Sequence, residues 1–150
     1  MNSTYVKELK RLLGNEVQVN FAGPEKGKGK LRTMRQDYCA VECKDGIYYY
    51  SMQHVKSINT VGKKEDGKDE AHHAGCQEPL FSGFSFQTLL VNMKGHRVTI
   101  NRKLKGIVVG ASKGNLILEH EGETMFVPLY HIQSVTLDKE KKEQKQEESQ

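Results

Sequence analysis

Three residues with soft metal-binding side chains stand close together near the middle of the sequence: His72, His73 and Cys76. Imidazole and thiolate groups are the ligands that zinc and copper prefer, so these residues are a weak candidate for a metal site. A fourth ligand with matching spacing is not evident, and the flanking residues are polar, as in a linker. We therefore expect a polar linker here, and no metal or other cofactor.

The sequence contains no recognisable set of catalytic residues. No Gly-x-Ser-x-Gly motif is present. Residues 23–30 are rich in glycine and lysine, but the spacing of a phosphate-binding loop is absent from every frame. These residues fit an exposed hairpin loop, in which Lys26 and Lys28 are candidate contacts for a partner. The sequence therefore predicts a protein without enzymatic activity.

Cys39 and Cys43 are expected on the same face of one strand. Four residues along a strand span about 13 Å, which is too far for a disulfide between them. A free cysteine in an apolar pattern behaves as a small hydrophobic residue, so we expect both in the core. Cys76 is then the candidate for a cross-link between chains. An odd number of cysteines and the absence of a signal-peptide pattern favour a reducing compartment.

The two halves of the sequence resemble each other. Residues 5–20 align with 86–101, residues 28–58 align with 105–135, and a single gap of four residues is needed. The identical pairs are Leu9/Leu90, Gly14/Gly95, Val17/Val98, Asn20/Asn101, Lys28/Lys105, Gly29/Gly106, Glu42/Glu119, His54/His131 and Ser57/Ser134. Apolar positions match as well, so the pattern predicts two copies of one small domain.

Several residues of the repeat have structural interpretations. Gly14 and Gly95 stand where a left-handed helix C-cap is expected, and Ser85 is a candidate N-cap. His54 and His131 recur at the same position, followed by Ser57 and Ser134. We expect the histidine rings to bond backbone groups at the turn before the last strand, although a metal ligand or a pH-sensitive contact is an alternative.

Each copy is expected to contain a short amphipathic helix followed by five short strands. The strands are predicted near 16–20, 28–35, 38–43, 47–51 and 55–58, and near 97–101, 105–111, 115–120, 124–128 and 132–136. The predicted fold is all-β with short helices, in two tandem SH3-like or Sm-like five-stranded barrels. The domains are 1–59 and 81–137, with a polar flexible linker at 60–80 and a charged disordered tail at 138–150.

Partners are less defined by the sequence. In the alternating strand 48–50, Tyr49 is expected in the core, whereas Tyr48 and Tyr50 are expected to be exposed and to contact a partner.

The net charge of +4 leaves nucleic acid as an alternative partner, but the stripe of basic residues is thin. No run of 18 apolar residues exists, so we expect no membrane insertion. A cytosolic Sm-like or SH3-like binding module for nucleic acid or regulation is therefore the second hypothesis.

The repeat signatures resemble a known family. Residues 14–17, Asn20, residues 22–25 and residues 54–58 (His-Val-Lys-Ser-Ile), with residues 128–135 in the second half, resemble the repeated N-terminal region of the spore coat protein B family of Bacillus-type endospore formers. The resemblance implies a structural component of the outer spore coat, assembled from the mother-cell cytoplasm, that contacts other coat proteins and itself. It carries over no catalytic residues. The tail after residue 137 holds a single serine, so a phosphorylation-dependent role of longer members is not implied.

Overall fold

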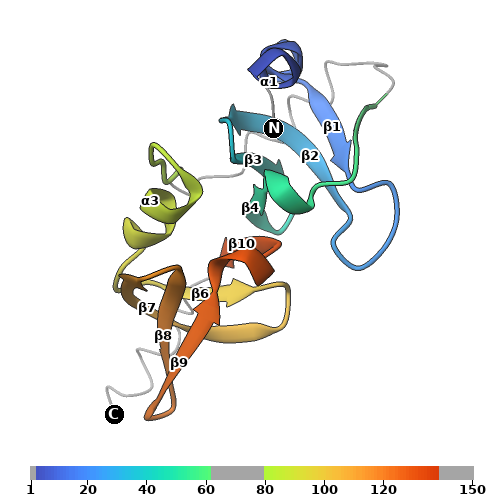
Figure 1. Cartoon of the computed structure of the whole chain (residues 1–150). Coiled ribbons are helices and arrows are strands. Elements are labelled where there is room, and N and C mark those ends of the chain that lie inside the picture. Colours follow the sequence, from blue (N-terminus) through green and yellow to red (C-terminus); the bar gives the residue numbers. More distant parts are fainter. Residues whose placement is uncertain (1–2, 62–79, 139–150) are drawn as a thin grey trace.

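The computed structural model describes residues 3–61 and 80–138, and these residues form a single ten-stranded antiparallel sheet with short helices (Figure 1). The prediction of a mostly β fold with short helices is confirmed. Within the described ranges, no helix has the length and apolar character needed to cross a membrane. Most of the expected linker (60–80) and tail (138–150) lies outside these residues.

Residues 3–61, the described part of the first half, contain one helix, five strands and a single 3-10 turn. They are α1 (Ser3–Lys10), β1 (Glu16–Val19), β2 (Gly27–Met34), β3 (Tyr38–Cys43), β4 (Gly46–Ser51), η1 (Met52–His54) and β5 (Ile58–Thr60). The second half has the same order: α3 (Phe86–Val91), β6 (Arg97–Ile100), β7 (Leu104–Ser112), β8 (Asn115–His120), β9 (Glu123–Pro128), η2 (Leu129–His131) and β10 (Ser134–Leu137).

The pairing register of the first half recurs in the second. Tyr38 lies opposite Ser51 across β3 and β4, and Asn115 lies opposite Pro128 across β8 and β9. The irregularity that follows Leu31 in β2 is repeated after Val108 in β7. Residues that the sequence alignment pairs therefore also occupy corresponding places in the sheet.

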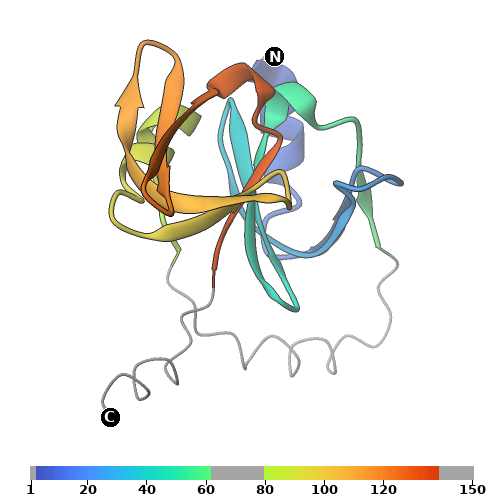
Figure 2. The same cartoon turned by 90° about the horizontal axis from the view of Figure 1, so that it is seen from below.

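The two halves meet in the middle of the sheet. The strand order is β5-β1-β2-β3-β4-β10-β6-β7-β8-β9, so β4 of the first half pairs with β10 of the second. Figure 1 shows these two strands side by side at the boundary, and Figure 2 shows the halves next to each other when viewed from below. Strands β5 and β9 are left at the two ends of the sheet.

The fifth strand of each half begins later than predicted, at Ile58 and at Ser134. The residues before it do not pair in the sheet because an asparagine side chain binds them instead. Asn20 Oδ1 accepts from Lys56 N at 2.7 Å, and Asn101 Oδ1 accepts from Gln133 N at 2.6 Å. Both asparagines adopt a left-handed φ, of 57° and 52°.

Each half has a buried apolar core, and the second core is shared. The first core contains Val17, Val19, Leu31, Cys39 and Val41, with Cys43 packed against it. The expectation that Cys39 and Cys43 are core residues is confirmed, and burial raises the pKa of both thiols to about 12. The second core contains residues from both halves: Tyr38, Ala40, Ile47 and Tyr49 from β3 and β4, with Phe86, Leu89, Leu90, Met93, Val98, Ile100, Val108, Leu116, Leu118, Ile132 and Val135.

The helices cover these cores in comparable ways. Val6 of α1 is buried in the first core, and α3 buries Phe86, Leu89 and Leu90. The predicted N-cap is confirmed, because Ser85 Oγ accepts from Thr88 N at 3.2 Å. Gly14 and Gly95 adopt left-handed φ values of 86° and 87° after the helices.

The glycine- and lysine-rich segment is only partly a loop, which corrects the expectation for residues 23–30. Strand β2 already begins at Gly27, and Gly27 and Gly29 are buried within it. A Cβ on Gly29 would lie 2.1 Å from the Glu42 carbonyl oxygen, and one on Gly27 would lie 2.1 Å from the Tyr50 hydroxyl. Glycine is therefore required here by close packing.

Replacing Gly29 by alanine should destabilise the fold, because the Cβ collides with the backbone of β3 and the strands must separate. We expect Gly29→Ala to lower the free energy of unfolding by about 2 kcal/mol, measured by urea denaturation. Gly110→Ala is the matched control in β7, since a Cβ there meets nothing within 4 Å. Equal losses in the two variants would contradict the packing argument.

Candidate functional site at the junction of the two halves

The junction is a short antiparallel ladder between β4 and β10. Ser134 lies opposite Tyr50, Val135 opposite Tyr49 and Thr136 opposite Tyr48. Beyond the ladder, Ser51 N donates to Gln133 O at 3.0 Å, and Thr136 Oγ1 donates to Ile47 O at 2.9 Å. Backbone and side-chain hydrogen bonds together therefore fix the register of the two halves.

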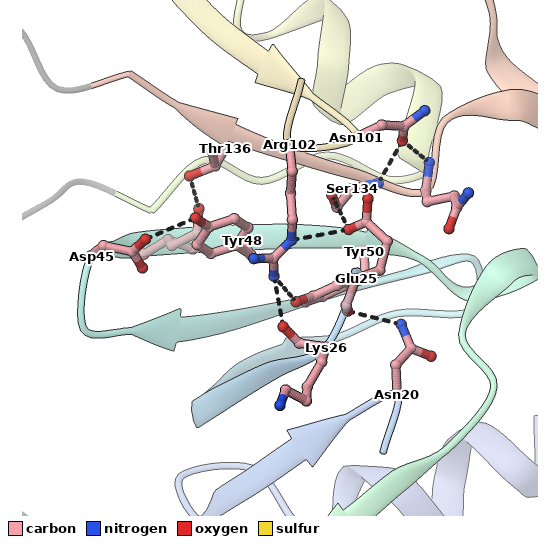
Figure 3. Close-up of polar contacts among 12 residues, drawn as sticks. Asn20, Glu25, Lys26, Asp45, Tyr48, Tyr50, Asn101, Arg102, Ser134 and Thr136 are labelled. Atoms are coloured by element: carbon pink, nitrogen blue, oxygen red, sulfur yellow. Dashed lines mark hydrogen bonds and ion pairs between the residues drawn. The ribbon is translucent and has the colours of Figure 1, made fainter. Parts of the chain in front are cut away.

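Arg102 crosses this junction from the turn after β6 (Figure 3). Its Nε donates to Glu25 Oε1 at 3.2 Å, and its Nη2 donates to Lys26 O and to the Tyr50 hydroxyl, each at 2.9 Å. The guanidinium carbon also lies 4.4 Å from the centre of the Tyr48 ring, in a cation–π arrangement. One side chain of the second half thus contacts four residues of the first.

Glu25 is the anionic partner of Arg102 and is 8% exposed. The same oxygen, Oε1, accepts from Ser134 Oγ at 2.6 Å, so the carboxylate is bonded from two elements of the second half. Asn20 Nδ2 donates to the Glu25 carbonyl oxygen at 3.0 Å and holds the backbone of this turn. A buried carboxylate is stable only with such partners.

The electrostatics of the junction favour a charged arginine and neutral tyrosines. Burial alone would lower the pKa of the Arg102 guanidinium, but Tyr50, Tyr48 and Glu25 raise it above its ordinary value. Burial raises the pKa of Tyr50 well above its usual range. Burial and a hydrogen bond to Asp45 raise the pKa of Tyr48 to about 12. The network is therefore built for binding, with a permanent cation at its centre.

A second set of contacts joins the segment before α3 to the first half. Both carboxylate oxygens of Asp37 accept from Phe86 N, at 3.1 and 3.0 Å. The Tyr38 hydroxyl accepts from Gly83 N at 3.1 Å and lies 3.0 Å from Gly83 O, while the Tyr49 hydroxyl accepts from Phe81 N at 2.9 Å. The first half therefore binds the start of α3 as well as β10.

The expectation that Tyr48 and Tyr50 are exposed is wrong. Both are buried, and they face the first core and Arg102 of the second half. The sequence pattern places alternate residues on opposite faces, but it does not show that both faces of β4 are covered. Their partner is the other half of the same chain.

The two histidines of the repeat do not make equivalent contacts. His54 Nε2 lies 2.6 Å from Tyr130 O, which corrects the expectation of a bond within its own turn, because this carbonyl belongs to η2 of the second half. The ring of His131 lies against Tyr130, and its backbone carbonyl accepts from Asn101 Nδ2 at 3.0 Å. His54 therefore contributes to the junction.

The other candidate residues have separate locations. Ser57 Oγ accepts from Phe21 N at 3.1 Å within the first half, whereas its counterpart Ser134 binds Glu25 across the junction. The side chains of Lys26 and Lys28 are exposed. His72, His73 and Cys76 lie outside the described residues. In the part of the chain that the structure describes, no group of three or more metal-ligand side chains is assembled.

Sequence reasoning missed the residues that carry the junction: Arg102, Glu25 and Asp37. Arg102 follows Asn101, whereas the residue after Asn20 is Phe21, so the two copies differ at this position. Glu25 lies within the segment that is longer in the first copy. The available signal was therefore a difference between otherwise matching positions of the two halves, because β4 and β10 are not equivalent strands and the two sides of their junction carry different residues.

The sequence is similar to spore coat protein B of Bacillus subtilis (strain 168), with 28% identity over 133 residues. The match covers 84% of this chain and 33% of that protein, so the chain spans about a third of the length of this curated relative. No protein-family model matches the chain, and no solved structure gives a significant match. The similarity suggests a relative of spore coat protein B at low sequence identity.

Replacing Arg102 should weaken the junction, because the substitution leaves the Glu25 carboxylate buried without its cation. We expect Arg102→Met to lower the free energy of unfolding by about 2–3 kcal/mol. Lys103→Met, an exposed cation in the same turn, should change it by less than about 0.5 kcal/mol. The double variant Arg102→Met/Glu25→Gln should lose less than the sum of the single losses, and strict additivity would contradict the pairing.

The tyrosines at the junction should make stability fall at high pH. The pKa of Tyr48 is about 12 in the folded chain, against about 10 in an unfolded chain, so folding favours the neutral phenol. The contribution of the neutral Tyr48 phenol to the free energy of unfolding is complete below about pH 10. It is lost as the pH rises through the folded-state pKa. The urea concentration at the midpoint of unfolding should therefore fall less between about pH 10 and pH 12 in Tyr48→Phe than in the wild type. Parallel declines would refute the role of Tyr48.

Proposed function

We propose that this chain is a structural component of the bacterial spore coat, which acts through protein–protein contacts and carries out no catalysis. The observation that carries the proposal is the similarity to spore coat protein B over most of the chain. The sequence motifs in both halves belong to the same resemblance, and they lie in segments that form corresponding strands of the sheet.

We infer that the chain is a tandem repeat of a five-stranded small barrel of SH3-like or Sm-like type, with units at 1–59 and 81–137. The matching strand order and register of the two halves support this inference. Residues 60–80 would then act as a polar linker, and residues 138–150 as a charged tail. Small barrels of this kind host many functions, so the fold is compatible with an assembly protein but does not by itself assign that role.

The side chains of the junction also suit a structural role. Arg102, Glu25 and Ser134 are arranged to bind one another, with the guanidinium donating to one carboxylate, one carbonyl and one phenol. Ser134 Oγ donates to the Glu25 carboxylate, but Ser134 is only 1% exposed, so this hydroxyl is not open to a substrate. The burial and the contacts across the junction support a role of the network in holding the two halves together.

We place the chain in the outer layer of the coat, where it would be assembled from the mother-cell cytoplasm. Its partners would be other coat proteins and further copies of itself. Exposed Lys26 and Lys28, next to the loop of the first half, are candidate contacts for anionic groups on such partners.

Fractionation of sporulating cells tests this function directly. An epitope-tagged chain should be retained by purified, salt-washed spores and released with the detergent-extracted coat proteins, while a cytosolic reporter of the mother cell is washed away. Labelling of intact spores with an antibody to the tag would locate the chain in the outer layer. Recovery of the tagged chain only in the soluble mother-cell fraction would refute the proposal.

A further inference from the structure

The two terminal strands of the sheet are counterparts of the two strands that pair at the junction. Strand β9 occupies in the second half the place of β4 in the first, and β5 occupies the place of β10. An edge strand presents unpaired N–H and C=O groups that can pair with another chain. The chain therefore carries a β4-like edge at one end and a β10-like edge at the other.

The core of the first half is less well covered than the core of the second. Four of its apolar residues are only partly buried, whereas their four counterparts in the second half are fully buried. The pairs are Leu9/Leu90, Leu12/Met93, Val55/Ile132 and Ile58/Val135. The difference has a structural cause, because β3 and β4 of the first half contribute side chains to the second core and the first core has no corresponding cover within the described residues.

The counterparts of β3 and β4 are β8 and β9, and the face of these strands that could cover a first core is exposed at the other end of the sheet. Phe126 of β9 is 62% exposed, whereas its counterpart Tyr49 in β4 is 0% exposed. Ile117 of β8, the counterpart of buried Ala40, is also partly exposed. Ile117 and Phe126 lie opposite each other across β8 and β9, so they form an apolar patch at the edge of the sheet, which is a candidate interaction surface.

At the two ends of the sheet, the counterparts of the Arg102 network are residues that are complementary to one another. Phe21 takes the place of Arg102 after the turn asparagine that recurs in both halves, and it is 69% exposed. Met125 and Val127 take the places of Tyr48 and Tyr50, which Arg102 contacts. An aromatic ring against a thioether and a branched aliphatic side chain is a favourable apolar contact. A cation with two phenols is thus replaced on both sides by apolar groups.

We infer that β9 of one copy pairs with β5 of a second copy, in a head-to-tail contact that repeats the β4·β10 junction between chains. The internal register sets the register between copies: Ile58 lies opposite Phe126, Ser57 opposite Val127 and Asn59 opposite Met125. Phe126 then covers the open side of the first core of the next copy. The partner that this surface fits is therefore a second molecule of the same protein.

The contact between copies is weaker than the internal junction. Ser51 N donates to Gln133 O at the internal junction, whereas the counterpart of Ser51 is Pro128, which has no N–H to donate. Asn115 and Thr124 replace the apolar counterparts Tyr38 and Ile47. The association is therefore reversible and depends on concentration. Because each added copy leaves one free edge of each kind, the contact builds rings or filaments.

This inference deepens the proposed coat function by naming one partner and its surface, and it relies on that function only for its biological setting. The two can fail separately. Fractionation of spores tests location, whereas the mass of the purified chain in solution tests self-association.

Sedimentation velocity of the full chain over micromolar to millimolar concentrations tests the contact. The wild type should form species heavier than the 17.0 kDa monomer as concentration rises. Phe126→Glu should remain monomeric, because it places a charge on the β9 surface. Phe84→Glu is the matched control, since Phe84 is 87% exposed and lies on neither terminal strand, and it should associate like the wild type. Association that Phe126→Glu leaves intact would overturn the inference, as would a monomeric wild type at millimolar concentration.

A mixing experiment tests the head-to-tail direction. Phe126→Glu blocks the β9 end and Ile58→Glu blocks the β5 end, so each variant alone should be monomeric and an equimolar mixture should form dimers and nothing larger. Phe21→Glu serves as a second β5-end variant if circular dichroism shows that Ile58→Glu does not fold. Self-association of the β5-end variant alone would indicate β9–β9 pairing and contradict the head-to-tail contact.

Discussion

The pairing of β4 with β10 is the interaction on which the rest of the structure depends. Each half is a sheet of short strands that could bury only a small core alone, and sheets of that size are marginally stable. The pairing joins both sheets into one and places four side chains of the first half in the core of the second. Arg102 and Glu25 add a partly buried ion pair that specifies which edges meet. We regard this pair as a determinant of specificity more than of stability.

The two halves share a register but differ in chemistry, and some of the differences lie at the strands that pair at the junction and at those that end the sheet. Positions that line the internal junction carry an arginine, tyrosines and a serine, whereas the corresponding positions at the ends of the sheet carry Phe21, Met125, Val127 and Pro128. A repeat in which both copies were identical would pair equally well with itself and with its neighbour. The differences therefore distinguish the permanent contact within the chain from a weaker contact outside it.

Much of the fold follows from local sequence patterns, whereas the junction does not. Turn glycines, the Ser85 cap and the alternation around Val41 predict the elements, because these signals act over a few residues. The burial of Tyr48 and Tyr50 and the role of Asp37 depend on residues 49–54 positions away, which no local pattern encodes. Arg102 looks like any exposed turn cation in the sequence. It becomes an interface residue because the longer loop of the first half brings Glu25 to it and β4 presents Tyr48 and Tyr50.

Differential scanning calorimetry of the full chain tests most directly whether the two halves form one cooperative unit. A shared core and a partly buried ion pair across the junction predict a single unfolding transition, with a calorimetric enthalpy equal to the van't Hoff enthalpy. Two separable transitions, each with the enthalpy of a domain of about half the chain, would contradict this account.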